Sequence, residues 1–152
     1  MPSAVGWVDL YGSCAWALSV LFAARVLGQA VQRWMPQPFL PPFEAFQGSS
    51  LPYWLLLSFQ LLILVVMVRV AWRVQTDRLV PSRRVGLWLA GAGAVYMAFA
   101  LGRIAVGLAV PDADAWFKTW IPAFFHLVLA AFLLVVSLYH LRGTAPTTGE
   151  EP

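Results

Sequence analysis

Residues 52–73 read PYWLLLSFQLLILVVMVRVAWR, and this stretch decides the fold class. It is as long as the roughly 20 apolar residues that an α-helix needs to cross the hydrocarbon core of a bilayer. Pro52 stands at its start, where the missing N–H of a proline costs a helix nothing. The apolar residues follow one another without the alternation of a barrel strand, which excludes a β-barrel. The stretch therefore predicts one membrane-spanning helix.

Three other stretches have the same character, at about 10–33, 85–109 and 118–141. The whole chain is 61% hydrophobic and only 11% charged, whereas a soluble domain has about 25% charged residues. A water-soluble fold of this size cannot cover its surface with so few charges, so most of the surface must face lipid. We predict an all-α integral membrane four-helix bundle that residues 1–143 form as a single domain. Residues 144–152 are predicted to be a disordered polar tail.

The charges between the predicted spans indicate the orientation of the bundle. The second loop is rich in arginine, whereas the third loop holds Asp112, Asp114 and only Lys118. Positively charged loops stay on the cytoplasmic side, so we expect both termini inside the cell and the first loop outside. Nine of the ten basic residues are arginine, a composition typical of GC-rich bacterial genomes. A multi-pass protein of a bacterial inner membrane is the expected localisation. The arginines of the second loop and its borders are Arg73, Arg78, Arg83 and Arg84.

Small residues recur along the third predicted span at every fourth position. In lipid, helices associate by close backbone approach through such residues. We expect this ridge to be a packing surface and the helix at 85–109 to be central, with either another span or another subunit against it. The ridge consists of Gly86, Ala90, Ala94, Ala98 and Gly102.

One strongly polar side chain falls inside each predicted span, at a similar depth. Arg25, Gln60, Arg103 and His126 lie six to eight residues below the expected outer boundary, which corresponds to about 9–12 Å. Ionisable groups inside a bilayer are costly and usually have a function. The sequence therefore favours a shared pocket in the outer leaflet, although each side chain could instead snorkel to the headgroups or bond a neighbouring carbonyl.

Three further residues are predicted to extend this pocket. Gln29 follows Arg25 by one helical turn, and Tyr96 precedes Arg103 by two turns. The first loop is rich in aromatic residues, and Pro41-Pro42 could start a short interfacial helix that ends near Gly48. This helix could be a lid that places Glu44 above the two arginines, or only an anchor in the interface.

The predicted pocket restricts the ligand and the chemistry. Two arginines favour an anionic or quinone-like amphiphile, such as an anionic lipid or a quinone, over a cation. No metal or other cofactor is expected, because the chain has one cysteine, Cys14, and its two histidines, His126 and His140, are about 21 Å apart on one helix. Nucleic acid is not expected as a partner, because the basic residues sit at the ends of the apolar stretches.

Three functions are consistent with these patterns. The first is a small membrane protein that binds such an amphiphile from the surrounding membrane lipids. The second is a structural or accessory subunit that docks through the 85–109 ridge, in a homo-oligomer or in a larger membrane complex. The third is a lipid-headgroup enzyme with His126 as its acid or base. The sequence contains no diagnostic catalytic motif, and binding is the preferred interpretation.

Overall fold

The computed structural model describes residues 4–47, 51–112 and 114–143, and every regular element in this part of the chain is a helix. Four helices are long and apolar enough to cross a membrane, so the predicted integral membrane four-helix bundle is confirmed. The predicted ends of these helices agree with the structure to within two residues, except that the first helix begins at Ala4. The predicted tail at 144–152 lies outside the described residues. The elements are α1 (Ala4–Trp34), α2 (Phe43–Gln47), α3 (Tyr53–Gln75), α4 (Arg83–Ala109), α5 (Ala115–Lys118) and α6 (Trp120–Arg142).

Local sequence signals explain where several helices begin and end. Pro52 occupies the N-cap of α3, and Pro111 follows the end of α4. Asp114 caps α5, because its carboxylate accepts a hydrogen bond of 2.9 Å from the backbone N–H of Trp116. Beyond α3 the chain turns at Asp77, which adopts a left-handed φ of 51°, a conformation that aspartate tolerates better than most residues.

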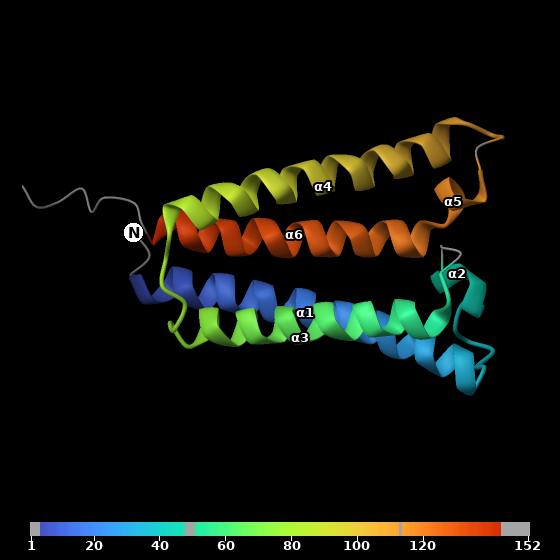
Figure 1. Ribbon diagram of the computed structural model, residues 1–152, viewed down its shortest axis with the longest axis horizontal. Helices are drawn as coiled ribbons and strands as arrows, with labels where there is room; N and C mark the ends of the chain where they lie inside the picture. The colour runs from blue at the N-terminus through green and yellow to red at the C-terminus, as the bar shows by residue number, and fades with distance from the viewer. Residues whose placement is uncertain (1–3, 48–50, 113, 144–152) are drawn as a thin grey trace, which may run out of the picture.

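The long helices form two hairpins, α1–α3 and α4–α6 (Figure 1). The short helices α2 and α5 lie in the loops at one end of the bundle, which we call the α2–α5 end. The start of α1, the end of α6 and the loop between α3 and α4 lie together at the opposite end, which we call the α3–α4 loop end.

The central helix is α6, not α4 as the small-residue ridge predicted. Helix α6 packs against α4 on one side and against α1 on the other, while α3 packs mainly on α1 and makes only slight contact with α6. In the most apolar 18-residue stretch of α6, 44% of the residues are buried inside the bundle, whereas the corresponding share for α4 is 17%. Helix α4 is therefore an edge helix, and α3 and α4 scarcely touch.

The side of α4 that faces α6 also differs from the predicted ridge. Gly86, Gly93 and Ala100 are buried there at intervals of seven residues, whereas Ala94, Ala98 and Gly102 are exposed. A step of four residues turns about 40° around a helix, so a ridge of five such residues leaves the interface. A step of seven drifts by only about 20° and follows the neighbouring helix. Of the predicted ridge, only Gly86 is buried against α6, where a Cβ would lie 2.9 Å from the side chain of Leu141.

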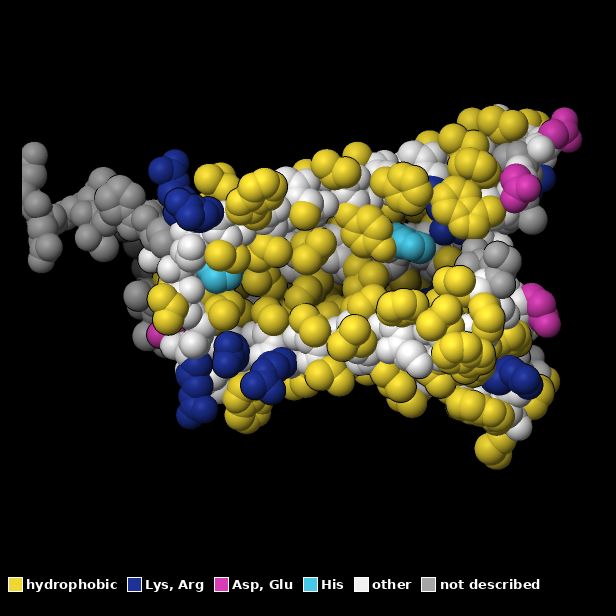
Figure 2. Space-filling view, in the orientation of Figure 1, with side chains coloured by type: hydrophobic (Ala, Val, Ile, Leu, Met, Phe, Trp, Pro, Cys, Tyr) yellow, Lys and Arg dark blue, Asp and Glu magenta, His cyan; other side chains and the backbone are white. Residues whose placement is uncertain are grey.

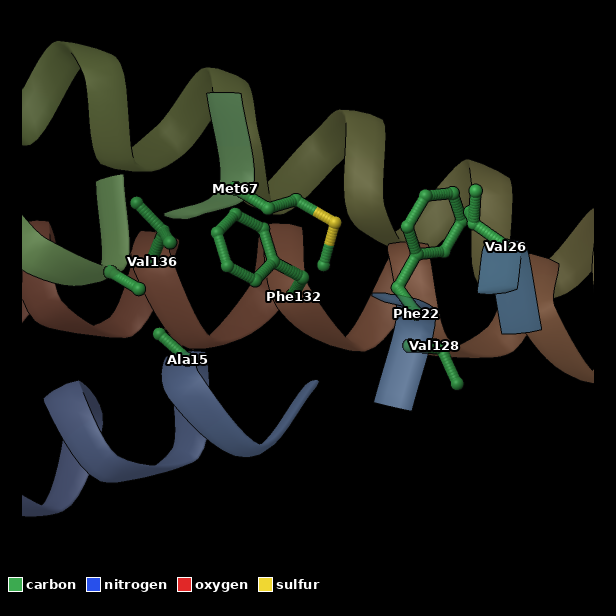
Figure 3. Close-up of a cluster of buried hydrophobic side chains, with 8 residues drawn as sticks. Ala15, Phe22, Val26, Met67, Val128, Phe132 and Val136 are labelled. Carbon is green, nitrogen blue, oxygen red and sulfur yellow. The ribbon is translucent and has the colours of Figure 1, made fainter. Parts of the chain in front are cut away.

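The main apolar core joins α1, α3 and α6 (Figure 3). Ala15 and Phe22 of α1 pack with Met67 of α3 and with Phe132 and Val136 of α6. Helix α4 contributes none of the buried members of this core cluster within the described residues. The second hairpin therefore joins the first mainly through α6.

Polar contacts close the α3–α4 loop end. The hydroxyl of Tyr139, which is fully buried, lies 2.7 Å from the carbonyl oxygen of Leu79, to which it donates a hydrogen bond. Ser137 of α6 donates a hydrogen bond of 2.9 Å to the carbonyl oxygen of Gly86 on α4. These hydrogen bonds connect α6 to α4 and to the loop between α3 and α4.

Candidate functional site

A cavity of about 290 Å³ lies near the α2–α5 end, between the two hairpins. On the face shown in Figure 2, the surface is hollowed between the α4–α6 pair and the α1–α3 pair, and hydrophobic side chains cover the middle of the molecule. All four long helices contribute to the cavity wall. Its polar lining residues are Arg25, Gln47, Gln60, Tyr96, Arg103 and His126. Its apolar lining residues are Phe22, Leu51, Leu56, Phe59, Ile63, Trp116, Pro122, Phe125 and Leu129.

The structure brings together five of the seven side chains that the sequence predicted for a pocket. Arg25 comes from α1, Gln60 from α3, Tyr96 and Arg103 from α4, and His126 from α6. Only the three-dimensional arrangement could show this, because a similar depth on four helices does not determine which way each side chain points. Binding of a ligand by these residues stays a prediction.

Gln29 lies directly behind the cavity wall rather than in it. It is fully buried, and its Oε1 accepts a hydrogen bond of 3.1 Å from Nε2 of Gln60. Each glutamine keeps one buried atom without a hydrogen-bond partner, Nε2 of Gln29 and Oε1 of Gln60. Buried polar atoms of this kind are rare and call for an explanation, such as a bound polar group. Because Gln60 lines the cavity, its amide is the member of the pair that a ligand can reach.

Glu44 lies outside the cavity. It is on α2, exposed, and absent from the cavity lining. Phe46, two residues later, is buried and its ring approaches Gly28. Two residues correspond to about 200° around a helix, so burying Phe46 turns Glu44 away from the bundle. The short helix α2 itself matches the prediction, whereas its position relative to a membrane surface stays a prediction.

Arg25 binds the backbone of α2 in place of Glu44. Its side chain is 8% exposed, and Nη2 donates a hydrogen bond of 3.0 Å to the carbonyl oxygen of Phe46. The last carbonyl groups of a helix have no partner within the helix and readily accept such a bond. The guanidinium group also lies 5.4 Å from the ring centre of Phe125, while its Nε is buried without a hydrogen-bond partner.

Arg103 is held more tightly, by the segment that contains α5. Its side chain is 3% exposed, and Nε and Nη2 donate hydrogen bonds of 3.1 and 2.5 Å to the carbonyl oxygen of Trp116. Nη2 also contacts Oγ1 of Thr119 at 2.7 Å. The guanidinium group stacks 4.0 Å from the centre of the Trp116 ring system, a favourable cation–π distance.

His126 and Tyr96 form the side of the cavity between α6 and α4. Nδ1 of His126 lies 2.6 Å from the carbonyl oxygen of Pro122. Because a carbonyl oxygen can only accept, Nδ1 is the protonated nitrogen that donates this hydrogen bond. In the neutral ring, Nε2 is then a hydrogen-bond acceptor. The two rings lie edge to face at 5.6 Å, and the Tyr96 hydroxyl makes no hydrogen bond with the described residues.

The lining combines charged and neutral polar groups. It contains two permanent cations, an amide, a phenol and an imidazole, but no serine, cysteine or carboxylate among the described residues that line it. Within the part of the chain that the structure describes, no group of His, Cys, Asp and Glu side chains is arranged to hold a metal ion.

The partners that hold the arginines in place were not predicted from the sequence. Neither Trp116 nor Thr119 was among the predicted site residues, and the structure shows Thr119 at the N-cap of α6. The apolar lining residues Phe22 and Phe125 resembled ordinary residues of a membrane span. No signal in a single sequence distinguishes them from residues that face lipid.

The chain was compared with protein-family models, with curated proteins and with solved structures, and none of them matches. The function therefore has to be inferred from the site, because a four-helix bundle by itself hosts many unrelated functions.

Proposed function

We propose that this small integral membrane protein binds an amphiphile with an anionic or quinone-like head in the cavity between its two hairpins. The observation that carries the proposal is the convergence of Arg25, Gln60, Arg103 and His126, one from each long helix, on one cavity. Polar groups inside a membrane are costly and usually mark a functional site. The apolar groups between them would cover the hydrocarbon part of the ligand.

The arrangement of the helices supports entry of the ligand from the side. Helices α3 and α4 both line the cavity but scarcely contact each other. An amphiphile could move in between them from the bilayer without passing through water. The cavity volume of about 290 Å³ is at the lower limit of the roughly 300–1,000 Å³ that ligand pockets usually have. It suits a head group whose tail stays among the surrounding membrane lipids.

The proposal places the cavity in the outer leaflet of a cell membrane. The arginine-rich loop lies at the α3–α4 loop end, opposite the cavity. By the positive-inside rule that end faces the cytoplasm. The ligand would therefore be an amphiphile of the outer leaflet, and a bacterial inner membrane is the proposed location.

Native mass spectrometry of the full chain in a mild detergent tests the proposal. Ile63→Trp adds bulk to the cavity wall, whereas Leu62→Trp is a matched control on the neighbouring residue, which is 61% exposed. We expect the unmodified chain and Leu62→Trp to retain a copurified or added amphiphile, and Ile63→Trp to lose it. Equal retention by the two variants, or none by the unmodified chain, would contradict the proposal.

A second candidate function is docking onto another membrane protein or a second copy of this chain. It is favoured by the exposed small residues of α4: a Cβ added at Gly102 would meet no atom of another described element within 4 Å, so this face is left uncovered by the described residues. Ala98→Leu should then weaken assembly while the amphiphile is still bound, and Val65→Leu on the exposed side of α3 is the control. An unchanged oligomeric state in Ala98→Leu would argue against docking through this face.

A further inference from the structure

We infer that the head group is an anion, a phosphate or a carboxylate, shared between Arg25 and Arg103, and that its hydrocarbon tail leaves the cavity between α3 and α4. This inference rests on the proposed function and specifies the chemical class of the ligand. It separates an anionic lipid or fatty acid from a quinone, which offers carbonyl groups but no charge.

The first support is the charge balance of the cavity. Arg25 and Arg103 are both more than nine-tenths buried, and both line it. No described carboxylate lies within ion-pair distance, 4.0 Å, of either guanidinium group. Burying a charge without a counter-charge carries a desolvation cost that hydrogen bonds to neutral groups offset only in part. Carbonyl oxygens satisfy some of the N–H groups but do not cancel the charge, so an anion between the two arginines is the missing counter-charge.

The second support is the set of donors that the protein leaves unused. In Arg25, only Nη2 bonds a described residue, and Nε is buried without a partner. In Arg103, Nε and Nη2 bond to the α5 segment, and Nη1 makes no hydrogen bond with the described residues. A guanidinium group has five N–H donors in a planar fork that matches the oxygens of a carboxylate or phosphate. The hydrogen bonds to backbone carbonyl oxygens orient both guanidinium groups before a ligand binds.

The third support is the apolar path from the cavity to the lipid. Leu56, Phe59 and Ile63 follow one another along α3 at helical spacing, and all three line the cavity. Phe59 is also 52% exposed, so it forms part of the rim. On α6, Phe125 and Leu129 line the cavity one turn apart. A hydrocarbon chain attached to a head group at the arginines can therefore lie against apolar side chains from the cavity to the bilayer.

Binding of tail-matched probes to the purified full chain tests the inference. The probes are dioleoyl phosphatidylglycerol against dioleoylglycerol, which has the same tails but no phosphate, oleate against oleyl alcohol, decyl-ubiquinone, and inorganic phosphate alone. We expect each anionic lipid to bind about tenfold or more tightly than its neutral counterpart, because hydrogen bonds to charged groups are the stronger ones. Inorganic phosphate should bind much more weakly, since it has no tail.

The outcomes separate the two proposals. If no amphiphile binds the unmodified chain, the proposed function fails. If decyl-ubiquinone or the neutral lipids bind as tightly as the anionic ones, the function stands and the anion is ruled out. If inorganic phosphate alone binds as tightly as the anionic lipids, the tail path is wrong.

Variants of Arg25 locate the anion. Arg25→Gln should lower binding of the anionic lipids about tenfold and so remove most of the preference for them, whereas Arg25→Lys should keep part of the preference. Arg84→Gln is the control, because Arg84 is exposed at the opposite end of the bundle. A preference in Arg25→Gln equal to that of the unmodified chain would overturn the inference. Arg103→Gln is predicted to act in the same way, but the Arg25 variants decide the question even if Arg103→Gln fails to fold.

Discussion

The two hairpins place an arginine in the same cavity by the same means but hold it with different strength. In each hairpin the arginine lies near the end of the first long helix and donates to a carbonyl oxygen of the short helix that follows, Phe46 in α2 or Trp116 in α5. Arg103 makes contacts with two residues of its segment and stacks 4.0 Å from Trp116. Arg25 makes one hydrogen bond and keeps a buried Nε without a partner.

This difference shows that similar depth in the membrane does not mean a similar role. The bonds of Arg103 connect α4 to the start of α6, so its guanidinium group stabilises the second hairpin even in the absence of a ligand. Arg25 contributes less to the packing and has more donors available. We therefore expect loss of Arg103 to affect both stability and binding, and loss of Arg25 to affect mainly binding.

Arg103→Ala should give the largest loss of stability. Removing the side chain leaves the half-buried carbonyl oxygen of Trp116 with only the Thr119 hydroxyl as a donor, and it removes the stacking contact. We expect the free energy of unfolding of ligand-free protein to fall by about 3 kcal/mol, since hydrogen bonds to a charged group are worth roughly 1.5–3 kcal/mol each. Unfolding in mixed detergent micelles measures it. A loss no larger than that of Arg25→Ala would remove the distinction between the two hairpins.

Gly93→Leu should give the next largest effect, because it tests the packing within the second hairpin. A Cβ at this position would already lie 2.9 Å from the side chain of Leu134 on α6. Overpacking of this kind costs about 2 kcal/mol. The same unfolding measurement on Ala98→Leu, on the exposed side of α4, should show a change below about 0.5 kcal/mol. A larger loss of unfolding free energy in Ala98→Leu than in Gly93→Leu would show that the predicted ridge is the packing surface after all.

Arg25→Ala should cost only about 1.5 kcal/mol in ligand-free protein, because a single hydrogen bond from the charged group to Phe46 is lost. The stabilisation by an added anionic lipid should disappear in this variant, since a ligand stabilises only the state that binds it. Unfolding with and without dioleoyl phosphatidylglycerol measures both effects. Equal stabilisation of Arg25→Ala and the unmodified chain would show that Arg25 is not the ligand-directed arginine.

Glu44→Gln should have the smallest effect of the series. Glu44 is exposed on α2 and lies outside the cavity. We expect changes below about 0.5 kcal/mol in the free energy of unfolding and no change in lipid preference. A marked increase in anion binding would show that Glu44 reaches the arginines and neutralises one of them.

Much of the candidate site could be predicted because of the physical cost of polar groups in lipid. Arg25, Gln60, Arg103 and His126 stood out as polar side chains within apolar stretches, and all four line one cavity. Glu44 was misplaced because the burial of Phe46 sets the rotation of α2. The ridge along α4 was misinterpreted because small residues mark close approach without showing which side of the helix the neighbour occupies.

Composition and the length of the apolar stretches determined by themselves that the chain forms four helices able to cross a membrane, and proline and charge determined where these helices end. The reason is that the length of a span and the cost of burying charge in lipid depend on residues that are close in the sequence. Only the tertiary structure decided that α6 is central, that α4 packs through Gly86, Gly93 and Ala100, and that two arginines far apart in the chain face one cavity. These features depend on how each helix is rotated about its axis, and the packing of side chains from different helices sets that rotation.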